Sequence, residues 1–224
     1  FYDKYGISID TNKKILIKKD KTLNYSNQFN TKISKNNIKN KLTTKKILKY
    51  NNIPTPNYYK WNKNRTINSN MNSMEFTVKY PIVIKPTNLE RGTGVYVNIP
   101  NRKVASHIIN KLLKKTNNIM VEEYNHSKAY RILVFNDTII GVYEIIKPTI
   151  TGDGKSTVIE LINQLNKKSK VPLDYDQIIS SVLKISNSIL PNGENIIISN
   201  VANAARCSTY GSISVDQINP VNVE

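Results

Sequence analysis

Residues 80–97, YPIVIKPTNLERGTGVYV, constrain the fold more than any other part of this chain. Two runs of β-forming residues flank a polar turn that contains Gly92-Thr93-Gly94. The chain has only 8 glycines in 224 residues, yet it places two of them around one threonine. Lys85 lies near the end of the first β-run. The segment therefore predicts two strands joined by a glycine loop, which is either an ordinary hairpin turn or a loop that holds a phosphate.

Two lysines in apolar surroundings favour the phosphate interpretation. Glycine lacks a Cβ atom, so the amide groups of such a loop can approach phosphate oxygens, and Lys85 would add a compact positive charge. A predicted helix places Lys45 in line with three apolar residues, namely Ile38, Leu42 and Leu48, before Pro54 and Pro56 end it. Lys45 either snorkels from the edge of this apolar stripe or joins Lys85 at a shared anion site.

The composition bounds the class of partner. The formal net charge of +17 would suit a nucleic-acid partner if the basic residues were clustered. The lysines are instead spread along the chain, without arginine–aromatic interleaving or zinc-ligand spacing, so a general attraction to polyanions is favoured. The single cysteine, Cys207, excludes an internal disulfide and fits a reducing compartment. No apolar run is long enough to span a bilayer, and we expect a cytoplasmic protein, with self-association left open.

The pattern of hydrophobic residues and turn signals predicts a mixture of hairpins and helices. We expect a hairpin at 6–18, a loop at 19–36, a strand at 118–124 and a hairpin at 130–147 that turns at Asn136-Asp137. Helices are expected at 102–116, with Val104, Ile108 and Leu112 inward, at 158–168, and from Asp174 or Asp176 to Leu190. Residues 149–157 are expected as a loop, 194–201 as a strand, and the rest as polar loop. This order indicates an α+β fold.

The second glycine loop, TITGDGKST at 149–157, has some features of a Walker A loop, because Gly154-Lys155-Ser156 lies between a β-run and a helix. That motif needs a glycine five residues before Gly154, where this chain has Thr149. The preceding strand is also expected to pair as a hairpin rather than in a parallel sheet. A P-loop nucleotidase is therefore disfavoured.

Taken in order, these segments resemble the ATP-grasp superfamily, and most closely the ATP-grasp domains of cyanophycin synthetase and of bifunctional glutathione synthetases. The matching segments are 44–56 (TK to IPTP), 81–86 (PIVIKP), 92–95 (GTGV), 121–131 (VE to Arg131), 152–157 (GDGKST), and Asn200 and Asn203 leading to Asp216. The resemblance covers residues 38–216, and TGDGKST is its most specific element.

The resemblance implies an ATP-grasp fold, in which two α+β lobes grip ATP. It divides the chain into an N-terminal hairpin and loop (1–36), a first lobe with a glycine-rich lid (37–120) and a partial second lobe (121–224). The implied activity is ATP-dependent carboxylate–amine ligation through an acylphosphate, with Mg2+ as a cofactor and a small carboxylate, amino acid or peptide as substrate. A nucleic-acid partner and a membrane are not expected.

The resemblance also assigns roles to residues. Lys45 and Lys85 would bind the ATP phosphates, and Arg131 would act on the phosphates or the acylphosphate as the catalytic residue. The lid, here called the glycine loop (residues 90–95), comprises Glu90, Arg91, Gly92, Thr93, Gly94 and Val95. The hinge strand would hold adenine with Glu122, Glu123 and Tyr124. Taken alone, Glu122 and Glu123 also fit solvated strand positions, and Arg131 fits a surface charge.

The chain departs from the family pattern in several places. Ala129 stands where relatives carry an acid for the ribose hydroxyls, and Glu144 and Ile145 lie near the place of hairpin arginines, which Lys147 could replace in part. The stretch AARCSTYGS after Asn203 replaces a Gly-Gly stretch.

The magnesium-binding carboxylate strands of the family are not recognisable in the sequence. Asp216 and Glu224 are the only late acids, so the metal ligands stay unassigned. Either the 224 residues, which begin at Phe1, are a piece of a longer ligase, or the chain is an inactive nucleotide- or polyanion-binding module on the same fold.

Overall fold

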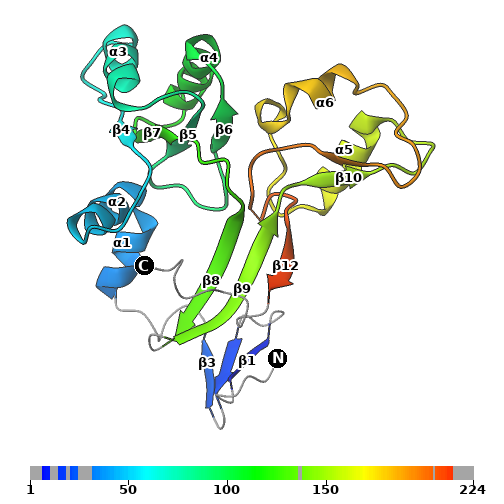
Figure 1. The fold of residues 1–224 in the computed structure, drawn as a ribbon, viewed down its shortest axis with the longest axis horizontal. Helices are drawn as coiled ribbons and strands as arrows, with labels where there is room; N and C mark the ends of the chain where they lie inside the picture. The colour runs from blue at the N-terminus through cyan, green and yellow to red at the C-terminus, as the bar shows by residue number, and fades with distance from the viewer. Residues whose placement is uncertain are drawn as a thin grey trace.

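The computed structural model describes residues 7–10, 15–18, 21–24, 32–135, 138–203 and 205–213. Figure 1 shows two groups of helices and strands, with the long strands β8 (Ala129–Phe135) and β9 (Thr138–Ile146) descending between them. All strand pairs in the described residues are antiparallel. The predicted α+β class is therefore confirmed.

The first lobe is built on a four-stranded sheet of order β4-β7-β5-β6. Its elements are β4 (Tyr58–Lys60), α3 (Ile67–Thr77), β5 (Ile82–Pro86), β6 (Tyr96–Ile99), α4 (Arg102–Leu113) and β7 (Ile119–Glu123). The two helices share one core with the sheet, which includes Met71, Met74, Ile108 and Ile109. Because β7 is an inner strand of this sheet, we propose that the first lobe extends to residue 123, beyond the expected border at 120/121.

Strand alternation gives this sheet two different faces. Ile82 and Ile84 of β5 and Val121 of β7 lie in the core beneath α3 and α4. Val83 and Lys85 point to the opposite face, because successive side chains of a strand alternate. Glu122 is the register partner of Val83 on the neighbouring strand and shares that face. The sheet thereby separates an apolar core from a face that carries charge.

Two helices precede the sheet where the sequence predicted one. α1 (Lys32–Lys39) ends before Asn40, and α2 (Lys41–Tyr50) begins after it. The Asn40 side chain accepts hydrogen bonds from the backbone N–H groups of Leu42 and Thr43, at 3.0 and 3.3 Å, and so caps α2. Ile38 therefore lies on a different helix from Lys45 and is 66% exposed, so its place in the predicted stripe was wrong.

The second lobe contains two small sheets and a separate core. The sheet β12-β9-β8 adds the strand β12 (Thr209–Ile213), and β10 (Thr149–Thr151) pairs with β11 (Asn195–Ile197). The helical segments are α5 (Val158–Lys168), the 3-10 turn η1 (Tyr175–Gln177) and α6 (Ser180–Lys184). Their core includes Ile150, Val158, Ile162, Val182 and Ile198.

The N-terminal hairpin at 6–18 is confirmed by β1 (Ile7–Asp10) and β2 (Ile15–Lys18), and β3 (Lys21–Asn24) adds a third strand. The expected loop at 19–36 was wrong in part, because it contains β3 and the start of α1. The hairpin of β8 and β9 is confirmed, but its predicted turn at Asn136-Asp137 lies outside the described residues.

Three further predictions failed because contacts distant in sequence decided the local structure. The expected loop at 149–157 begins with β10, and the expected polar end contains β12, since each finds a partner strand. The helix expected from Asp174 to Leu190 is broken after η1, where Ile179 N–H donates to the carbonyl of Ile198 at 2.9 Å. A fourth expectation, that Val104 of α4 points inward, was also wrong, because Val104 is 37% exposed and Ala105 is buried in its place. Among the described residues, no helix is both long and apolar enough to cross a membrane.

Candidate functional site: a cationic cavity between the lobes

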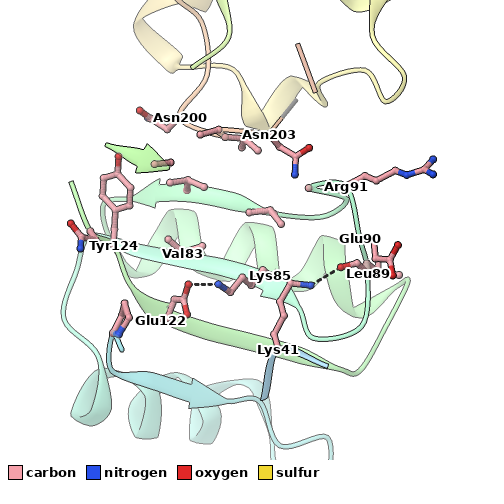
Figure 2. Close-up of a pocket in the computed structure, with 18 of the residues that line it drawn as sticks. Lys41, Val83, Lys85, Leu89, Glu90, Arg91, Glu122, Tyr124, Asn200 and Asn203 are labelled. Atoms are coloured by element: carbon pink, nitrogen blue, oxygen red, sulfur yellow. Dashed lines mark hydrogen bonds and ion pairs between the residues drawn. The ribbon is translucent and has the colours of Figure 1, made fainter. Parts of the chain in front are cut away.

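A cavity of about 660 Å³ opens on the charged face of the first-lobe sheet. Val83 and Lys85 of β5 and Glu122 of β7 line it from one side. Figure 2 shows Asn200 and Asn203, which belong to the second lobe, on the other side. The cavity therefore lies between the two lobes, where the resemblance predicts a nucleotide.

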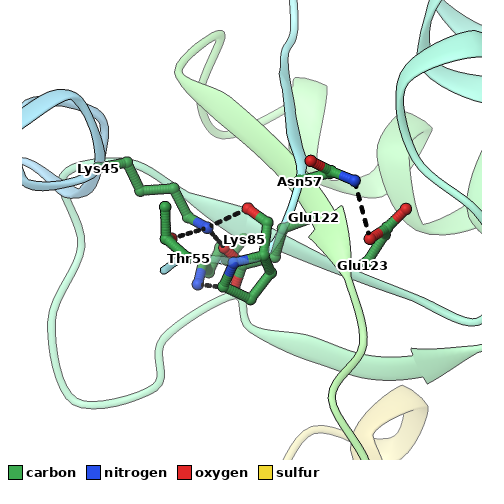
Figure 3. A network of polar contacts seen from close by, with 7 residues as sticks. Lys45, Thr55, Asn57, Lys85, Glu122 and Glu123 are labelled. Atoms are coloured by element: carbon green, nitrogen blue, oxygen red, sulfur yellow. Dashed lines mark hydrogen bonds and ion pairs between the residues drawn. The ribbon is translucent and has the colours of Figure 1, made fainter. Parts of the chain in front are cut away.

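Lys45 and Lys85 meet at one carboxylate, although they belong to a helix and to a strand. The Lys45 ammonium lies 3.0 Å from Glu122 Oε2, and Lys85 forms an ion pair with Glu122 Oε1 (Figure 3). Lys45 also donates to Thr55 Oγ1 and to the Pro56 carbonyl, both at 2.8 Å. The two lysines meet at Glu122, whose side chain neutralises part of their charge, and of the two Lys85 lines the cavity while Lys45 does not.

A third lysine, Lys41, was missed by the sequence analysis. It lies in the first turn of α2, lines the cavity and donates to the Leu89 carbonyl at 2.5 Å. Figure 2 shows Lys41 and Lys85 next to each other, with Lys85 directed at Glu122. Burial lowers the pKa of Lys41, and the nearby positive charge of Lys85 lowers it further. Lys41 could have been predicted from the sequence, because residues four apart on a helix lie on the same face and Lys41 precedes Lys45 by four.

The glycine loop (residues 90–95) forms a tight double turn at the cavity edge. Thr93 N–H donates to the Glu90 carbonyl at 3.1 Å, and Val95 N–H donates to the Gly92 carbonyl at 3.2 Å. Gly92 and Gly94 have φ values of 68° and 65°, in the left-handed region that favours glycine. Glu90, Arg91, Gly92 and Val95 line the cavity, whereas Thr93 and Gly94 are not among the residues that line it. The Arg91 side chain extends away from Lys41 and Lys85 (Figure 2).

The polar groups of the hinge residues Glu123 and Tyr124 already form hydrogen bonds within the fold. Glu123 N–H donates to the Asn57 carbonyl at 3.1 Å, and Tyr124 N–H donates to the Pro81 carbonyl at 3.0 Å. The Glu123 carboxylate accepts from Asn57 Nδ2 at 3.2 Å (Figure 3) and from Lys79 N–H, also at 3.2 Å. Both residues line the cavity, but their backbone N–H groups are already used within the fold.

Arg131 is not among the residues that line this cavity. Its guanidinium carbon lies 5.7 Å from the centroid of the Tyr210 ring, and the Tyr210 and Tyr143 rings are 6.1 Å apart at 64°. The structure therefore brings Lys45, Lys85, Glu122 and the glycine loop together and leaves Arg131 on a strand of the second lobe. Ala129, where the resemblance predicts an acid, does line the cavity.

The second glycine loop forms a capped helix start. The Asp153 carboxylate accepts from the N–H groups of Lys155 and Ser156, at 2.9 and 2.6 Å, and from Ser156 Oγ at 2.7 Å. Hydrogen bonds from Ser156 lower the pKa of Asp153 to about 2. Gly152 packs against backbone, since a Cβ there would lie 2.0 Å from the Pro191 carbonyl oxygen. The preceding strand β10 is antiparallel to β11, in keeping with the rejection of a Walker loop.

No cluster of three or more His, Cys, Asp or Glu side chains that could hold a metal ion occurs in the part of the chain that the structure describes. Asp216 and Glu224 lie outside that part. A second cavity of about 340 Å³ adjoins the first, and both are lined by Tyr124, Ala129 and Asn200. Lys147, which lines this second cavity, donates to Asn200 Oδ1 at 3.2 Å.

Curated relatives match this chain over more than half of its length. Cyanophycin synthetase of Nostoc sp. is 28% identical over 196 residues, which make up 82% of this chain and 21% of that protein. The bifunctional glutathione biosynthesis protein of Clostridium perfringens is 30% identical over 132 residues, or 58% of this chain and 17% of that protein. The chain thus spans about a fifth of the length of the curated relatives it matches.

A solved structure and a family profile extend the comparison. The bifunctional glutathione synthetase of Pasteurella multocida aligns with 96% of this chain and 32% of its own, at 19% identity and a TM-score of 0.45. Residues 39–159 match the family described as phosphoribosylglycinamide synthetase, ATP-grasp (A) domain. Since that match covers more than half of the chain, the chain belongs to the ATP-grasp domain family and has an ATP-grasp fold.

Proposed function

We propose that this chain binds ATP in the cavity between its lobes, as the nucleotide-binding part of an ATP-dependent carboxylate–amine ligase. The observation that carries the proposal is the meeting of Lys45 and Lys85 at Glu122, on the cavity face of the sheet. An ordinary glycine hairpin would need no such convergence of buried cations. Taking ammonium groups out of water is costly, so their retention favours a polyanionic ligand.

The phosphates would be held mainly by lysine. Lys85 and Lys41 line the cavity and would contact phosphate oxygens directly. Lys45, with a side chain only 8% exposed, lies behind Glu122 and would add its charge at longer range. Closure of the glycine loop (residues 90–95) over the phosphates would exclude water from the reaction.

The base and the sugar would be recognised differently from each other. Because the backbone N–H groups of Glu123 and Tyr124 already donate to carbonyls of the fold, adenine would be bound by hinge carbonyl oxygens and side chains. Val83 would provide an apolar contact to the base. Ala129 offers no acceptor to the ribose hydroxyls. We therefore expect weak discrimination between ribose and 2′-deoxyribose nucleotides.

The proposed reaction has two steps. A substrate carboxylate oxygen attacks the γ-phosphorus of ATP, which releases ADP and forms an acylphosphate. The amine then attacks the acyl carbon and expels inorganic phosphate, so that a C–N bond forms. The chain would contribute positioning and charge neutralisation rather than a covalent nucleophile. Arg131 stays the predicted catalytic residue, and its guanidinium would contact the phosphates or the acylphosphate.

Magnesium is expected from the resemblance, since magnesium takes carboxylate oxygens together with substrate phosphates. The described residues that surround the cavity do not fit a magnesium site, because their carboxylates form no cluster and Glu122 is held by two lysines. The acceptor substrates are proposed to be amino acids or peptides, by likeness to the cyanophycin and glutathione synthetases.

A second candidate is an inactive nucleotide- or polyanion-binding module. It is favoured by Ala129, which stands where an acid is expected to bind the ribose hydroxyls. It is also favoured by Arg131, which packs on Tyr210 and is not among the residues that line the cavity. A cytoplasmic location suits both candidates and stays a proposal.

The two candidates differ in turnover. Calorimetric titration with ATP should give saturable binding to this chain, and Lys85→Ala should weaken it. Magnesium-dependent ADP release would then be measured with a panel of amino acids and dipeptides, on the chain in its natural full-length context. ATP binding without ADP release from any substrate would favour the binding module. The absence of ATP binding would reject the ligase and the nucleotide-binding form of the module.

A further inference from the structure

Two buried side chains of the second lobe hold the glycine loop (residues 90–95) of the first. Gln177 Nε2 donates to the Val95 carbonyl at 2.7 Å and to the Gly92 carbonyl at 3.5 Å. Arg206 Nε donates to the Arg91 carbonyl at 3.1 Å. Backbone carbonyls at three positions of the loop therefore accept hydrogen bonds from the opposite lobe, and no sequence motif predicts these partners.

The donors are themselves held in place. Arg206 Nη1 donates to Gln177 Oε1 at 2.7 Å and to the Pro172 carbonyl at 2.8 Å. Gln177 Oε1 also accepts from Asp174 N–H at 3.0 Å. With its oxygen fixed by two donors, the Gln177 amide must turn its nitrogen toward the loop. Arg206 is 2% exposed and Gln177 is 5% exposed, so both lie inside the protein.

Arg206 is buried without an acidic partner. None of the salt bridges among the described residues includes it, and burial lowers its pKa. Burying a guanidinium is costly, and here hydrogen bonds to neutral oxygens and the more distant charge of Asp174 offset part of the cost. Its side chain also touches the loop, since a Cβ on Gly92 would lie 2.9 Å from Arg206 Cδ. The arginine and the glycine fit each other closely.

The geometry points to Gln177 and Arg206 as positioning residues of the phosphate-binding loop, a role that rests on the proposed binding of ATP. In a trans peptide the carbonyl and the following N–H point in opposite directions. Fixing the Arg91 carbonyl therefore fixes the direction of the N–H group of Gly92, which lines the cavity, whereas Thr93 N–H already donates to the Glu90 carbonyl. The contacts also join the lobes, so the loop reaches this conformation only when the second lobe is in place. We call this pair the interlobe clamp.

The test compares two methionine substitutions of glutamine. Gln177→Met removes the donor to the loop, and Gln164→Met changes an exposed glutamine of α5 as the matched control. Dissociation constants for ATP and for AMP would be measured by calorimetry, and backbone hydrogen exchange would be followed at residues 90–95 without nucleotide. Loss of one to two hydrogen bonds should weaken ATP binding about tenfold. AMP lacks the β- and γ-phosphates, so its dissociation constant for Gln177→Met should equal that for the wild type. Backbone hydrogen exchange at residues 90–95 should be faster in Gln177→Met than in the wild type.

A second variant covers the case in which Gln177→Met does not fold. Gln177→Glu keeps the shape and a partner for Arg206 but loses the donor, and it should also speed exchange in the loop and weaken ATP more than AMP. The clamp is overturned if the folded variant matches Gln164→Met in loop exchange and ATP affinity, or if ATP and AMP weaken equally. Failure of the wild type to bind ATP would instead remove the proposed function, and the positioning role with it.

Discussion

At the scale of single residues, Glu122 organises the site. Sequence reasoning placed Glu122 in the hinge strand against adenine, where backbone groups would make most of the contacts. The structure instead gives its side chain to Lys45 and Lys85, because alternation along β7 turns Glu122 to the cavity face. The convergence of the two lysines could be predicted from the apolar segments that contain them. Their shared counterion could not, since it depends on the register between β5 and β7.

Replacing Lys85 by alanine should weaken ATP binding by about ten- to a hundredfold, the usual range for losing a charge-assisted hydrogen bond. Lys155→Ala is the matched control, because Lys155 lies in the capped turn before α5 and does not line the cavity. Calorimetric titration with ATP measures both. A larger effect at Lys155 would restore the Walker interpretation of the second loop.

Neighbouring glutamates provide a second comparison. Glu122→Gln leaves two largely buried ammonium groups without a carboxylate and should destabilise the protein by about 3 kcal/mol. Glu123→Gln disturbs only exposed hydrogen bonds to Asn57 and Lys79 and should cost less than about 1 kcal/mol. Urea unfolding at neutral pH gives both free energies. Equal losses would show that Glu122 is not the shared counterion.

At the scale of elements, local signals predicted some segments well. α5 begins with a capping box, in which Thr157 and Glu160 satisfy each other's backbone N–H groups, and its apolar residues are spaced for a helix. The strand β12 and the break between η1 and α6 have no such signal. β12 arises from pairing with β9, and the break arises from hydrogen bonding to the distant residue Ile198. Single-sequence patterns do not contain that information. Gln177 and Arg206 escaped notice for the same reason.

Gly92 and Gly193 both have positive φ, but only at Gly92 would an added Cβ atom also collide with a neighbouring side chain. A Cβ on Gly92 (φ 68°) would lie 2.9 Å from Arg206 Cδ, whereas one on Gly193 (φ 81°) would meet nothing within 4 Å. Both alanine substitutions should cost about 1 kcal/mol from φ alone. Gly92→Ala should in addition weaken ATP binding several-fold. Unfolding and ATP titration of the two variants measure this, and equal ATP affinity would contradict contact between the loop and Arg206.

The start of α5 should respond to acid. The pKa of Asp153 is lowered in the folded protein from 3.8 to about 2, so its carboxylate stabilises the fold above pH 3.8 and loses that effect as the pH falls through 2. The stability difference between the wild type and Asp153→Ala should thus be constant near neutral pH and shrink between pH 4 and 2. Glu194→Ala, another exposed acid, is the control. Denaturant unfolding across this range checks it, and a difference unaltered at pH 2 would disprove the assignment.

At the scale of the whole molecule, the net charge of +17 should attract polyanions without selecting among them. Binding to duplex DNA should be weak and should fall by more than about tenfold between 50 and 200 mM salt, because it depends on counterion release. ATP, held in a cavity by a few lysines, should lose less affinity over the same range. Fluorescence anisotropy and calorimetry measure the two, and DNA binding that persists at high salt would return nucleic acid to consideration.

The carboxylate shared by Lys45 and Lys85 has a consequence for how quickly a ligand can be captured. The two ammonium groups would repel each other in this partly buried site, and in the folded protein the Glu122 carboxylate offsets that repulsion. An arriving triphosphate then meets a positive field that is already assembled, with no ammonium group to recruit from solvent. The rate of ATP association should therefore be limited by diffusion and by movement of the glycine loop. Repositioning of the charged side chains should add no separate slow phase.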